Sequence, residues 1–274
     1  MPAGARGKLL VIGDIHRHWS PADAPFIEAA DAAHVLFVGD LGDEDVEMVE
    51  RVAALRVRKS VVLGNHDAWA SFKANKPTPK LLRSLELLGQ DHIGFARREL
   101  PELGVTLLGA RPFSWGGPSL RSVEVYRGLY GISTMEEAAR RIVDLARGAH
   151  HRDVVILAHN GPAGLGTRID DIYGKDFGRP GGDWGDLDLQ IAVTRIKELG
   201  LRVPLVVAGH MHSHISGHKE LRRRATSEQD GTLYVNPAQV PRVVPRADGS
   251  GDSCHYTEIT LDHGKVADVR GFFA

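Results

Sequence analysis

The sequence predicts an α/β protein with two β-sheets and helices on their outer faces. Short apolar runs typical of buried strands alternate with segments of helical periodicity, which favours parallel strands joined by right-handed crossovers. Five of these runs end in Asp, His or Asn, usually directly after a glycine. Because ligands of α/β proteins bind at the carboxyl ends of the strands, we expect a functional site there. The five runs are residues 9–12, 35–38, 61–63, 154–158 and 205–208.

The first third of the chain shows the alternation most clearly. We expect a disordered lead over residues 1–7 and then a regular succession of strands and helices. Val46, Val49 and Val52 recur at helical spacing. The expected order is strand 9–12, helix 21–33 with Asp23 near its start, strand 35–38, helix 44–55 and strand 60–63.

The middle of the chain is less regular. Leucines on one face predict a helix over residues 79–88. A second helix is expected over residues 135–146, where Ser133 or Thr134 can act as the cap and two glutamates occupy the first turn. The remaining elements are strands at 93–99 and 105–110 in a second sheet, a loop at 111–117 and the strand at 154–158.

A long loop rich in Gly and Asp, residues 160–186, precedes the last elements. Loops of this length in compact domains are usually functional or disordered, so this one either covers the site or is a surface loop with solvated charges. A helix over 187–199, the strand at 205–208 and a hairpin of residues 255–261 and 265–273 follow. No linker or repeat interrupts the pattern, and we expect one domain over residues 1–274.

The composition excludes several classes of protein. The 274 residues carry 34 basic and 35 acidic side chains, and the formal net charge of -1 gives no general attraction to nucleic acid or an anionic membrane. The single cysteine, Cys254, excludes an intrachain disulfide framework and is expected to be a packed thiol. No apolar run approaches the roughly 20 residues of a membrane span, and the first residues do not fit a signal peptide. We expect a cytoplasmic protein without a membrane partner.

The polar residues at the strand ends carry the strongest functional signal. A lone histidine at a strand end is more often a structural hydrogen-bonding group than a metal ligand. Seven polar groups converging on one edge would, however, cost several kcal/mol unless something satisfied them, and a pair of divalent cations would do so. Mixed Asp, His and Asn ligands suit Mn, Fe or Zn, and two such ions can activate a water and clamp phosphoryl oxygens.

Five short motifs, in their order along the chain, resemble those of the calcineurin-like metallophosphoesterase superfamily. They are Asp14-Ile15-His16, Gly39-Asp40-Leu41-Gly42-Asp43, Gly64-Asn65-His66-Asp67, Ala158-His159-Asn160 and Gly209-His210-Met211-His212. The resemblance implies a four-layer α/β/β/α sandwich of two mixed β-sheets flanked by helices, and two divalent metal ions, with Mn expected and Fe, Zn or Ni as alternatives. One ion would take Asp14, His16, Asp40 and His212. The other would take Asp40, Asn65, His159 and His210, so that Asp40 bridges the two.

We assign proton transfer to His66, which follows a metal ligand and in the resembling family is not a ligand itself. It would assist the leaving group while a metal-bridging hydroxide attacks phosphorus. Asp43 would hold the His66 ring through its other nitrogen. The alternative for Asp43 is the N-cap of the helix at 44–55, and both roles are compatible. Asp67 is expected to stabilise its loop.

The sequence departs from the phosphoprotein-phosphatase branch of the superfamily, which carries Asp-Arg-Gly where this chain has Asp43-Glu44-Asp45. The phosphate-binding arginine is missing there, which argues against a phosphoprotein phosphatase and slightly favours a phosphodiester over a phosphomonoester. We expect a small phosphorylated substrate. Two alternatives are a non-catalytic metal-binding scaffold and a nuclease, the latter disfavoured by the near-neutral charge. The sequence leaves the oligomeric state open.

Substrate recognition has to come from less recognisable stretches. Arg111 and Trp115 are expected to line the cleft, and the Asn236-Pro237 pair to form its floor. His214 and His218 are expected to lie behind the ligands or on the surface. The basic run at residues 222–224 is expected to be solvated, with a phosphate contact as the alternative.

Overall fold

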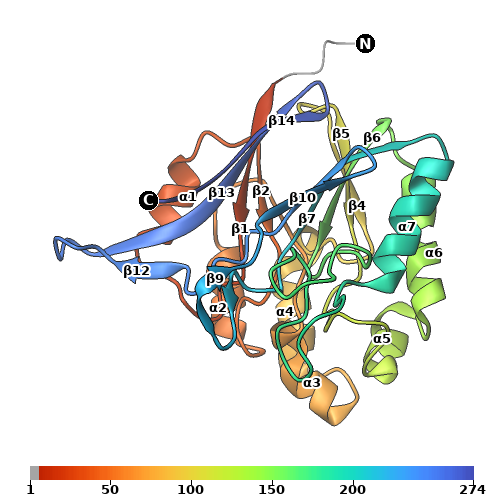
Figure 1. The fold of residues 1–274 in the computed structure, drawn as a ribbon, viewed down its shortest axis with the longest axis horizontal. Helices are drawn as coiled ribbons and strands as arrows, with labels where there is room; N and C mark the ends of the chain where they lie inside the picture. The colour runs from red at the N-terminus through yellow and green to blue at the C-terminus, as the bar shows by residue number, and fades with distance from the viewer. Residues whose placement is uncertain (1–5) are drawn as a thin grey trace.

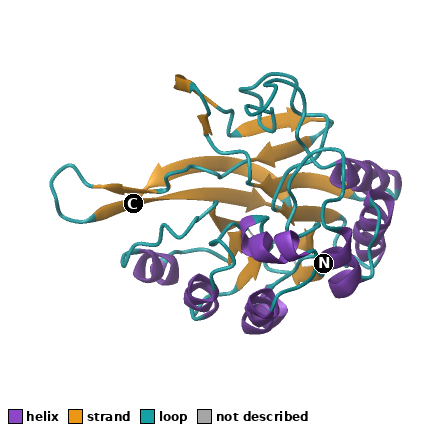
Figure 2. Ribbon diagram, turned by 90° about the horizontal axis from the view of Figure 1, so that it is seen from below, coloured by secondary structure: helices purple, strands orange, loops and turns teal. Residues whose placement is uncertain are grey.

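Two six-stranded β-sheets packed against each other form the centre of this computed structural model, which describes residues 6–274 (Figure 1). Helices lie outside the strands, as Figure 2 shows. The arrangement confirms the prediction of an α/β sandwich of two mixed sheets flanked by helices. Of the expected disordered lead, residues 1–5 lie outside the described residues, and Gly7 already begins the first strand.

The first sheet combines three parallel strands on one side with antiparallel pairs on the other. Its strands are, in order across the sheet, β12 (Val243–Pro245), β13 (Asp252–Asp262), β1 (Gly7–Ile12), β2 (His34–Phe37) and β3 (Lys59–Val61), with β14 (Lys265–Phe273) also paired to β13. β1, β2 and β3 are parallel, and β13 is antiparallel to β1. Helices α1 (Asp23–Ala29) and α2 (Val46–Ala53) connect the parallel strands.

The second sheet also contains both parallel and antiparallel pairs, in a different arrangement. Its order is β10 (Thr226–Gln229), β11 (Thr232–Val235), β7 (Arg202–Ala208), β6 (Asp153–Ala158), β5 (Val105–Gly109) and β4 (Arg97–Leu100). The four central strands are parallel and the two edge strands are antiparallel. The other elements are α3 (Trp69–Ala74), α4 (Pro79–Leu88), α5 (Val123–Tyr130), α6 (Met135–Arg147), α7 (Leu187–Glu198) and the pair β8 (His214–Ile215) and β9 (His218–Arg222).

Both faces of the central strands are buried, which explains why these runs are apolar throughout. Leu9 and Val11 of β1 pack between the sheets with residues of β6 and β7. Leu10 and Ile12, which point the other way, pack with the helices. The distance between the two sheets is therefore fixed by a close-packed apolar layer, and so is the distance between the polar residues that follow the strands.

Several element boundaries differ from the sequence prediction. The expected helix at 21–33 is only α1, and the expected strand at 93–99 begins at Arg97, because the backbone of Ile93 instead donates to the carbonyl of Val61 at 2.9 Å. α2 starts at Val46 and is capped by Asp45, whose carboxylate accepts from the amide of Glu47, so Asp43 is not the N-cap. Helices α3 and α5 were not predicted. The capping box of α6 selects Thr134 over Ser133.

A buried ion pair links the start of α1 to the C-terminal strands. Arg242, which is 1% exposed, binds Asp23 through two hydrogen bonds of 2.6 and 2.9 Å. The hydroxyl of Tyr256 donates to the same carboxylate at 2.7 Å. Asp23, expected only at the start of a helix, thus joins three distant segments of the chain.

Replacing this arginine tests how much the fold depends on the pair. We expect Arg242→Met to lower the free energy of unfolding by about 3–5 kcal/mol, because the Asp23 carboxylate would stay buried without its charged partner. Urea unfolding measures the change. The matched control is Arg140→Met on the exposed face of α6, which should change stability by less than about 0.5 kcal/mol. Equal effects of the two substitutions would contradict the structural role of the pair.

Candidate metal centre

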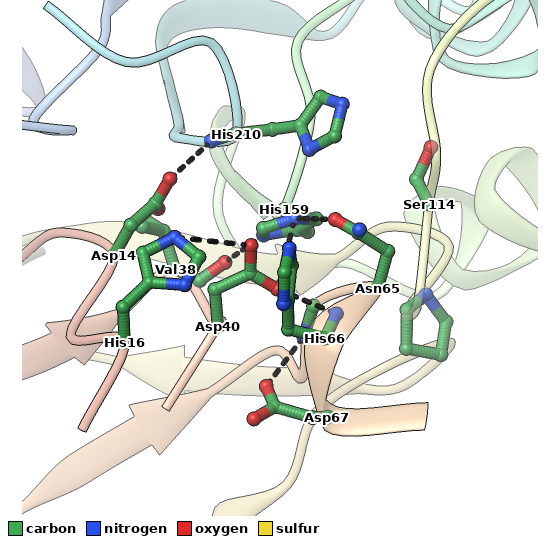
Figure 3. A network of polar contacts seen from close by, with 12 residues as sticks. Asp14, His16, Val38, Asp40, Asn65, His66, Asp67, Ser114, His159 and His210 are labelled. Carbon is green, nitrogen blue, oxygen red and sulfur yellow. Dashed lines mark hydrogen bonds and ion pairs between the residues drawn. The ribbon is translucent and has the colours of Figure 1, made fainter. Parts of the chain in front are cut away.

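The polar strand ends meet where the carboxyl ends of the two sheets face each other. Asp14, Asp40 and Asn65 come shortly after β1, β2 and β3 of the first sheet, whereas His159 and His210 follow β6 and β7 of the second. Figure 3 shows their side chains converging. The sequence predicts that these residues lie at one edge of a sheet. In the structure they come from the edges of two sheets, which face each other.

Three of the candidate ligands have a strained backbone. His16, Asp40 and His210 have φ values of 46°, 49° and 66°, in the left-handed region that residues with a side chain seldom adopt. Such conformations cost on the order of 1–3 kcal/mol each and cluster at functional sites. They turn the chain sharply after each strand and direct the side chains inward.

The glycines of the motifs provide space for the carboxylates. A Cβ atom at Gly64 would lie 2.2 Å from Oδ1 of Asp40, and one at Gly209 would lie 2.2 Å from Oδ1 of Asp14. Gly39 differs, because it has a φ of 99° and so also supplies the turn. Gly64 and Gly209 are thus explained by the close approach of a carboxylate from another motif.

Asp14, His16 and His212 form one cluster, in which one ligand atom from each residue lies within 4.8 Å of the others. The Nε2 atoms of the two histidines are 2.9 Å apart, and Nε2 of His212 is 3.4 Å from Oδ2 of Asp14. That Oδ2 atom accepts the backbone amide of His210 at 2.9 Å. Oδ1 of Asp14 is buried and has no hydrogen-bond partner among the described residues, and a cation would satisfy it.

Asp40, His159 and His210 form a second cluster of the same size. Nε2 of His159 lies 3.4 Å from Oδ1 of Asp40 and 2.8 Å from Oδ1 of Asn65. The other ring nitrogen of His159, Nδ1, contacts the carbonyl of Val38 at 2.8 Å. When Nδ1 donates to this carbonyl, Nε2 presents a lone pair toward the Asn65 oxygen. This is the orientation of a metal-binding histidine, and the residues fit a cation here.

Asp40 joins the two clusters. Its Oδ2 atom lies 3.6 Å from Nε2 of His16, and its Oδ1 atom accepts the backbone amide of His66 at 2.9 Å. A third group of possible ligands consists of His16, Asp40 and His66. Asp40 is 1% exposed and lies close to His16 of one cluster and His159 of the other.

Burial and neighbouring charges shift the pKa values of these groups strongly. Burial and the charge of Asp14 raise the pKa of Asp40 to about 7. Burial opposes ionisation of Asp14 too, but a hydrogen bond from His212 and the nearby imidazoles hold its pKa well below the usual range. Burial also lowers the pKa of His16 to about 4 and that of His210 far below its usual value. These two histidines are therefore neutral at pH 7, the form that binds metals.

His66 and Asp43 interact as predicted. Nδ1 of the His66 ring lies 2.5 Å from Oδ1 of Asp43, which leaves Nε2 free. The ring stands edge-on to His16, with centroids 4.7 Å apart. Asp67 has the expected structural role, because its carboxylate accepts the amides of Gly42 at 3.0 Å and Gly64 at 2.8 Å.

The five motifs and the strands that carry them match a known protein family. The model of the calcineurin-like phosphoesterase family matches residues 7–214. The chain belongs to the calcineurin-like phosphoesterase family. Members of this family are phosphoesterases that typically bind two metal ions. The resemblance carried by the five motifs is thereby confirmed.

Solved structures of low sequence identity share the fold of this phosphoesterase. One crystal structure aligns with 97% of this chain and 99% of its own, with 13% identity and a TM-score of 0.61. The protein TT1561 of Thermus thermophilus aligns over 97% and 98%, with 10% identity and a TM-score of 0.54. A putative 5'-nucleotidase from Staphylococcus aureus, solved with alpha-ketoglutarate, aligns over 98% of this chain and 54% of its own, with 14% identity and a TM-score of 0.53. A search of curated proteins finds no match.

Four of the candidate ligands line a cleft of about 700 Å³, namely Asp40, Asn65, His210 and His212. Trp115 lines it, as predicted, but Arg111 does not. Arg111 is 2% exposed and binds Asp186 at 3.0 Å and Asp188 at 2.7 Å, so it stabilises the loop instead. The additional lining residues that the sequence did not reveal are Trp69, Arg121, Asp176, Phe177 and Trp184, and His214 also reaches the cleft.

Arg223 is buried, although a solvated side chain is predicted for it. The side chain is hydrogen-bonded to backbone carbonyls. Its Nε donates to the carbonyl of His212 at 2.9 Å, while Nη1 donates to carbonyls of the long loop, at residues Ile169, Asp171 and Gly174. The loop and a candidate metal ligand are thus held by one guanidinium group. Nothing local in the sequence distinguishes Arg223 from its exposed neighbours at 222 and 224.

Asn236 and Pro237 lie behind the candidate ligands. The amide of Asn236 donates to the carbonyl of Met211 at 2.7 Å, and a Cβ at Gly13 would meet the carbonyl of Pro237 at 2.2 Å, so this pair supports the ligand segments from behind. Cys254 is buried and unpaired within the described residues. His218 is exposed. In residues 6–274, none of the helices has the length and apolar character required to span a bilayer.

The buried carboxylates predict how the stability of the metal-free protein depends on pH. Burial raises the pKa of Asp67 to about 8, with the charge of Asp40 adding to the effect, and that of Asp40 to about 7, against an ordinary value of 3.8. The folded protein retains protons that the unfolded chain has lost, so this stabilisation is complete below about pH 4 and disappears as pH rises through 7 and 8. The lowered histidine pKa values act in the opposite direction, but only below about pH 6.5.

We therefore expect the melting temperature of chelator-treated protein to fall between about pH 6.5 and about pH 8.5. Saturating Mn²⁺ should remove most of this fall, because bound cations stabilise the ionised carboxylates. Thermal unfolding at several pH values, with and without Mn²⁺, measures both effects. A metal-free melting temperature that stays constant or rises over this interval would show that the carboxylates are not strained in this way.

Proposed function

We propose that the protein is a dinuclear metal-dependent phosphoric ester hydrolase that favours phosphodiesters over phosphomonoesters. One observation carries the proposal. Four of the seven ligand-type residues line one cleft, and the other three belong to the same clusters of candidate ligands, which Asp40 links through its contacts with His16 and His159. The family match supports phosphoester chemistry, and the orphaned oxygen of Asp14 supports a cation at this position.

Each residue has a distinct role in the proposed reaction. Asp14, His16, Asp40 and His212 would hold one ion, and Asp40, Asn65, His159 and His210 the other. When bound, the two ions supply a hydroxide at neutral pH and neutralise charge on the phosphoryl oxygens. Mixed oxygen and imidazole ligands favour Mn, with Fe, Zn or Ni as alternatives.

His66 would protonate the leaving oxygen. Its Nδ1 contacts Asp43, which orients the ring and directs Nε2 away from this carboxylate. In the imidazolium form, Nε2 carries the proton to be transferred. The ring lies against the candidate metal residue His16, so the acid would stand next to the reacting phosphate.

The surroundings of the second motif support a diester substrate. Glu44, which occupies the position of the arginine in phosphoprotein phosphatases, is buried and accepts hydrogen bonds from the amide and hydroxyl of Ser71 at 2.8 and 2.9 Å. It stabilises the start of the α3–α4 region and offers no positive charge to a terminal phosphate. A cleft of about 700 Å³ suits a small phosphorylated substrate.

Metal reconstitution tests the proposal. Metal-stripped protein should hydrolyse bis-p-nitrophenyl phosphate only after Mn²⁺ or another divalent ion is restored, with about two ions bound per chain and a lower rate on p-nitrophenyl phosphate. Asp40→Asn should lose one or both ions and most of the turnover, whereas Asp230→Asn, a change at an exposed position, should keep both. Two bound ions without turnover on any phosphoester would favour a non-catalytic scaffold. Unchanged metal content in Asp40→Asn would remove the bridging role.

A second experiment tests the role of His66 through the leaving group. An acid matters most when the leaving group is a poor one, so His66→Ala should lose roughly 10²- to 10⁴-fold on diphenyl phosphate and clearly less on bis-p-nitrophenyl phosphate. Metal content should stay unchanged. His218→Ala, at an exposed histidine of β9, is the matched control. Equal losses on the two esters would show that His66 stabilises charge and is not the acid.

A further inference from the structure

The metal cleft has an aromatic wall that belongs to none of the five motifs. The wall consists of Trp69, Trp115, Phe177 and Trp184. They come from three separate parts of the chain: Trp69 begins α3, Trp115 lies in the loop after β5, and the other two lie in the 160–186 loop. Four large aromatic side chains around a site that binds metal ions and phosphate are not required by that chemistry. Their presence points to a second group on the substrate.

The wall begins at the proposed acid. The rings of His66 and Trp69 are stacked, with centroids 5.0 Å apart and an interplanar angle of 23°. Trp115 follows, with its ring 5.1 Å from that of Trp69. Since His66 would protonate the leaving oxygen, the leaving group has to extend from the phosphate on this side of the cleft. Trp69 and Trp115 therefore lie where the leaving group is bound.

Cations accompany these aromatic rings. The guanidinium of Arg121 lies 5.2 Å from the ring centre of Trp115, and the ammonium of Lys73 lies 5.0 Å from that of Trp69. A smaller hollow of about 200 Å³ adjoins the cleft and shares Trp69, Trp115 and Arg121 with it. An uncharged alkyl chain would gain nothing from these cations, whereas an electron-rich planar ring interacts with both aromatic and guanidinium groups.

The wall is held in place by contacts with the long loop. The indole Nε1 of Trp184 donates to the carbonyl of Trp115 at 2.8 Å, and the amide of Gly117 donates to the carbonyl of Trp184 at 2.9 Å. A Cβ at Gly116 would lie 2.5 Å from the Trp184 ring, so the two segments are in close contact. A preformed surface of this kind binds a ligand with little loss of conformational entropy.

We propose that the leaving group of the natural substrate carries a planar aromatic ring, joined to the scissile oxygen through a spacer as in a nucleoside, and that this ring packs against Trp115 and Arg121. The spacer follows from the order of the rings. An aromatic ring attached directly to the leaving oxygen would lie beside His66 and Trp69, whereas a ring one sugar away reaches Trp115. This inference rests on the proposed phosphoesterase function and names its substrate class.

Two diesters that differ only in the ring test the inference. Adenosine 5'-(methyl phosphate) and ribose 5-(methyl phosphate) share the same phosphate and sugar, and release of methyl phosphate reports cleavage on the proposed side. Stacking on a protein aromatic ring should raise kcat/KM for the adenosine diester roughly 10- to 100-fold over the ribose diester. Trp115→Leu should reduce this ratio to near one, whereas Trp115→Phe should retain most of it. Arg121→Ala, at an exposed position, should reduce the ratio in part and tests the wall without changing a packed residue.

The outcomes separate the two proposals. If the unmodified protein with restored metal does not hydrolyse bis-p-nitrophenyl phosphate, the phosphoesterase function itself is overturned. Turnover of that ester with no preference for the adenosine diester would overturn only the aromatic leaving group. A preference that survives in both Trp115→Leu and Arg121→Ala would place the ring elsewhere in the cleft and would likewise contradict the inference.

Discussion

The structure depends on one buried carboxylate, that of Asp40. It lies between two sheets that approach each other at their carboxyl ends, close to a second carboxylate on Asp14, and hardly any solvent reaches it. Two like charges in such a place need positive partners. Backbone amides and neutral imidazoles supply only part of that compensation. The folded chain therefore leaves part of this negative charge uncompensated, and divalent cations are suited to neutralise it. Gly64 and Gly209, which have no side chains, leave space for the two carboxylates.

The sheets carry the candidate metal ligands, whereas the loops and α3 carry the residues that would contact the rest of the substrate. The candidate ligands follow strands whose separation is fixed by a close-packed apolar layer. The packing of the core therefore also fixes the positions of these ligands. The aromatic and cationic residues, in contrast, lie on α3 and on loops outside the sheets. The candidate metal ligands thus lie at the ends of the strands, and the residues that would recognise the substrate lie on loops and a short helix, a division common to enzymes that carry their binding residues on loops.

The sequence predicted those parts of the molecule in which a residue's place in the fold follows from the strand or helix next to it in the chain. A ligand such as His159 directly follows an apolar strand, so the strand places it. The residues that escaped prediction are defined by partners far along the chain. Arg111 binds a carboxylate 77 residues away, and Glu44 binds Ser71 and Thr78, so none of their neighbours in sequence reveals their burial. The same holds for α3, a six-residue helix without a side-chain cap, which is stabilised by its packing and not by its own sequence.

The hydrogen bonds of Arg223 have a consequence for how this protein could change. Its guanidinium holds the long loop at residues 169, 171 and 174, and the loop closes on itself beyond that point through the amide of Lys175 and the carbonyl of Gly182. Residues 176–181 therefore form a short turn between two ends, Lys175 and Gly182, that this hydrogen bond joins. Insertions or replacements in this turn can alter the rim of the cleft next to Phe177 while His212 keeps its place. Evolution or protein engineering can therefore change the substrate specificity through this turn while the candidate metal ligands stay in place.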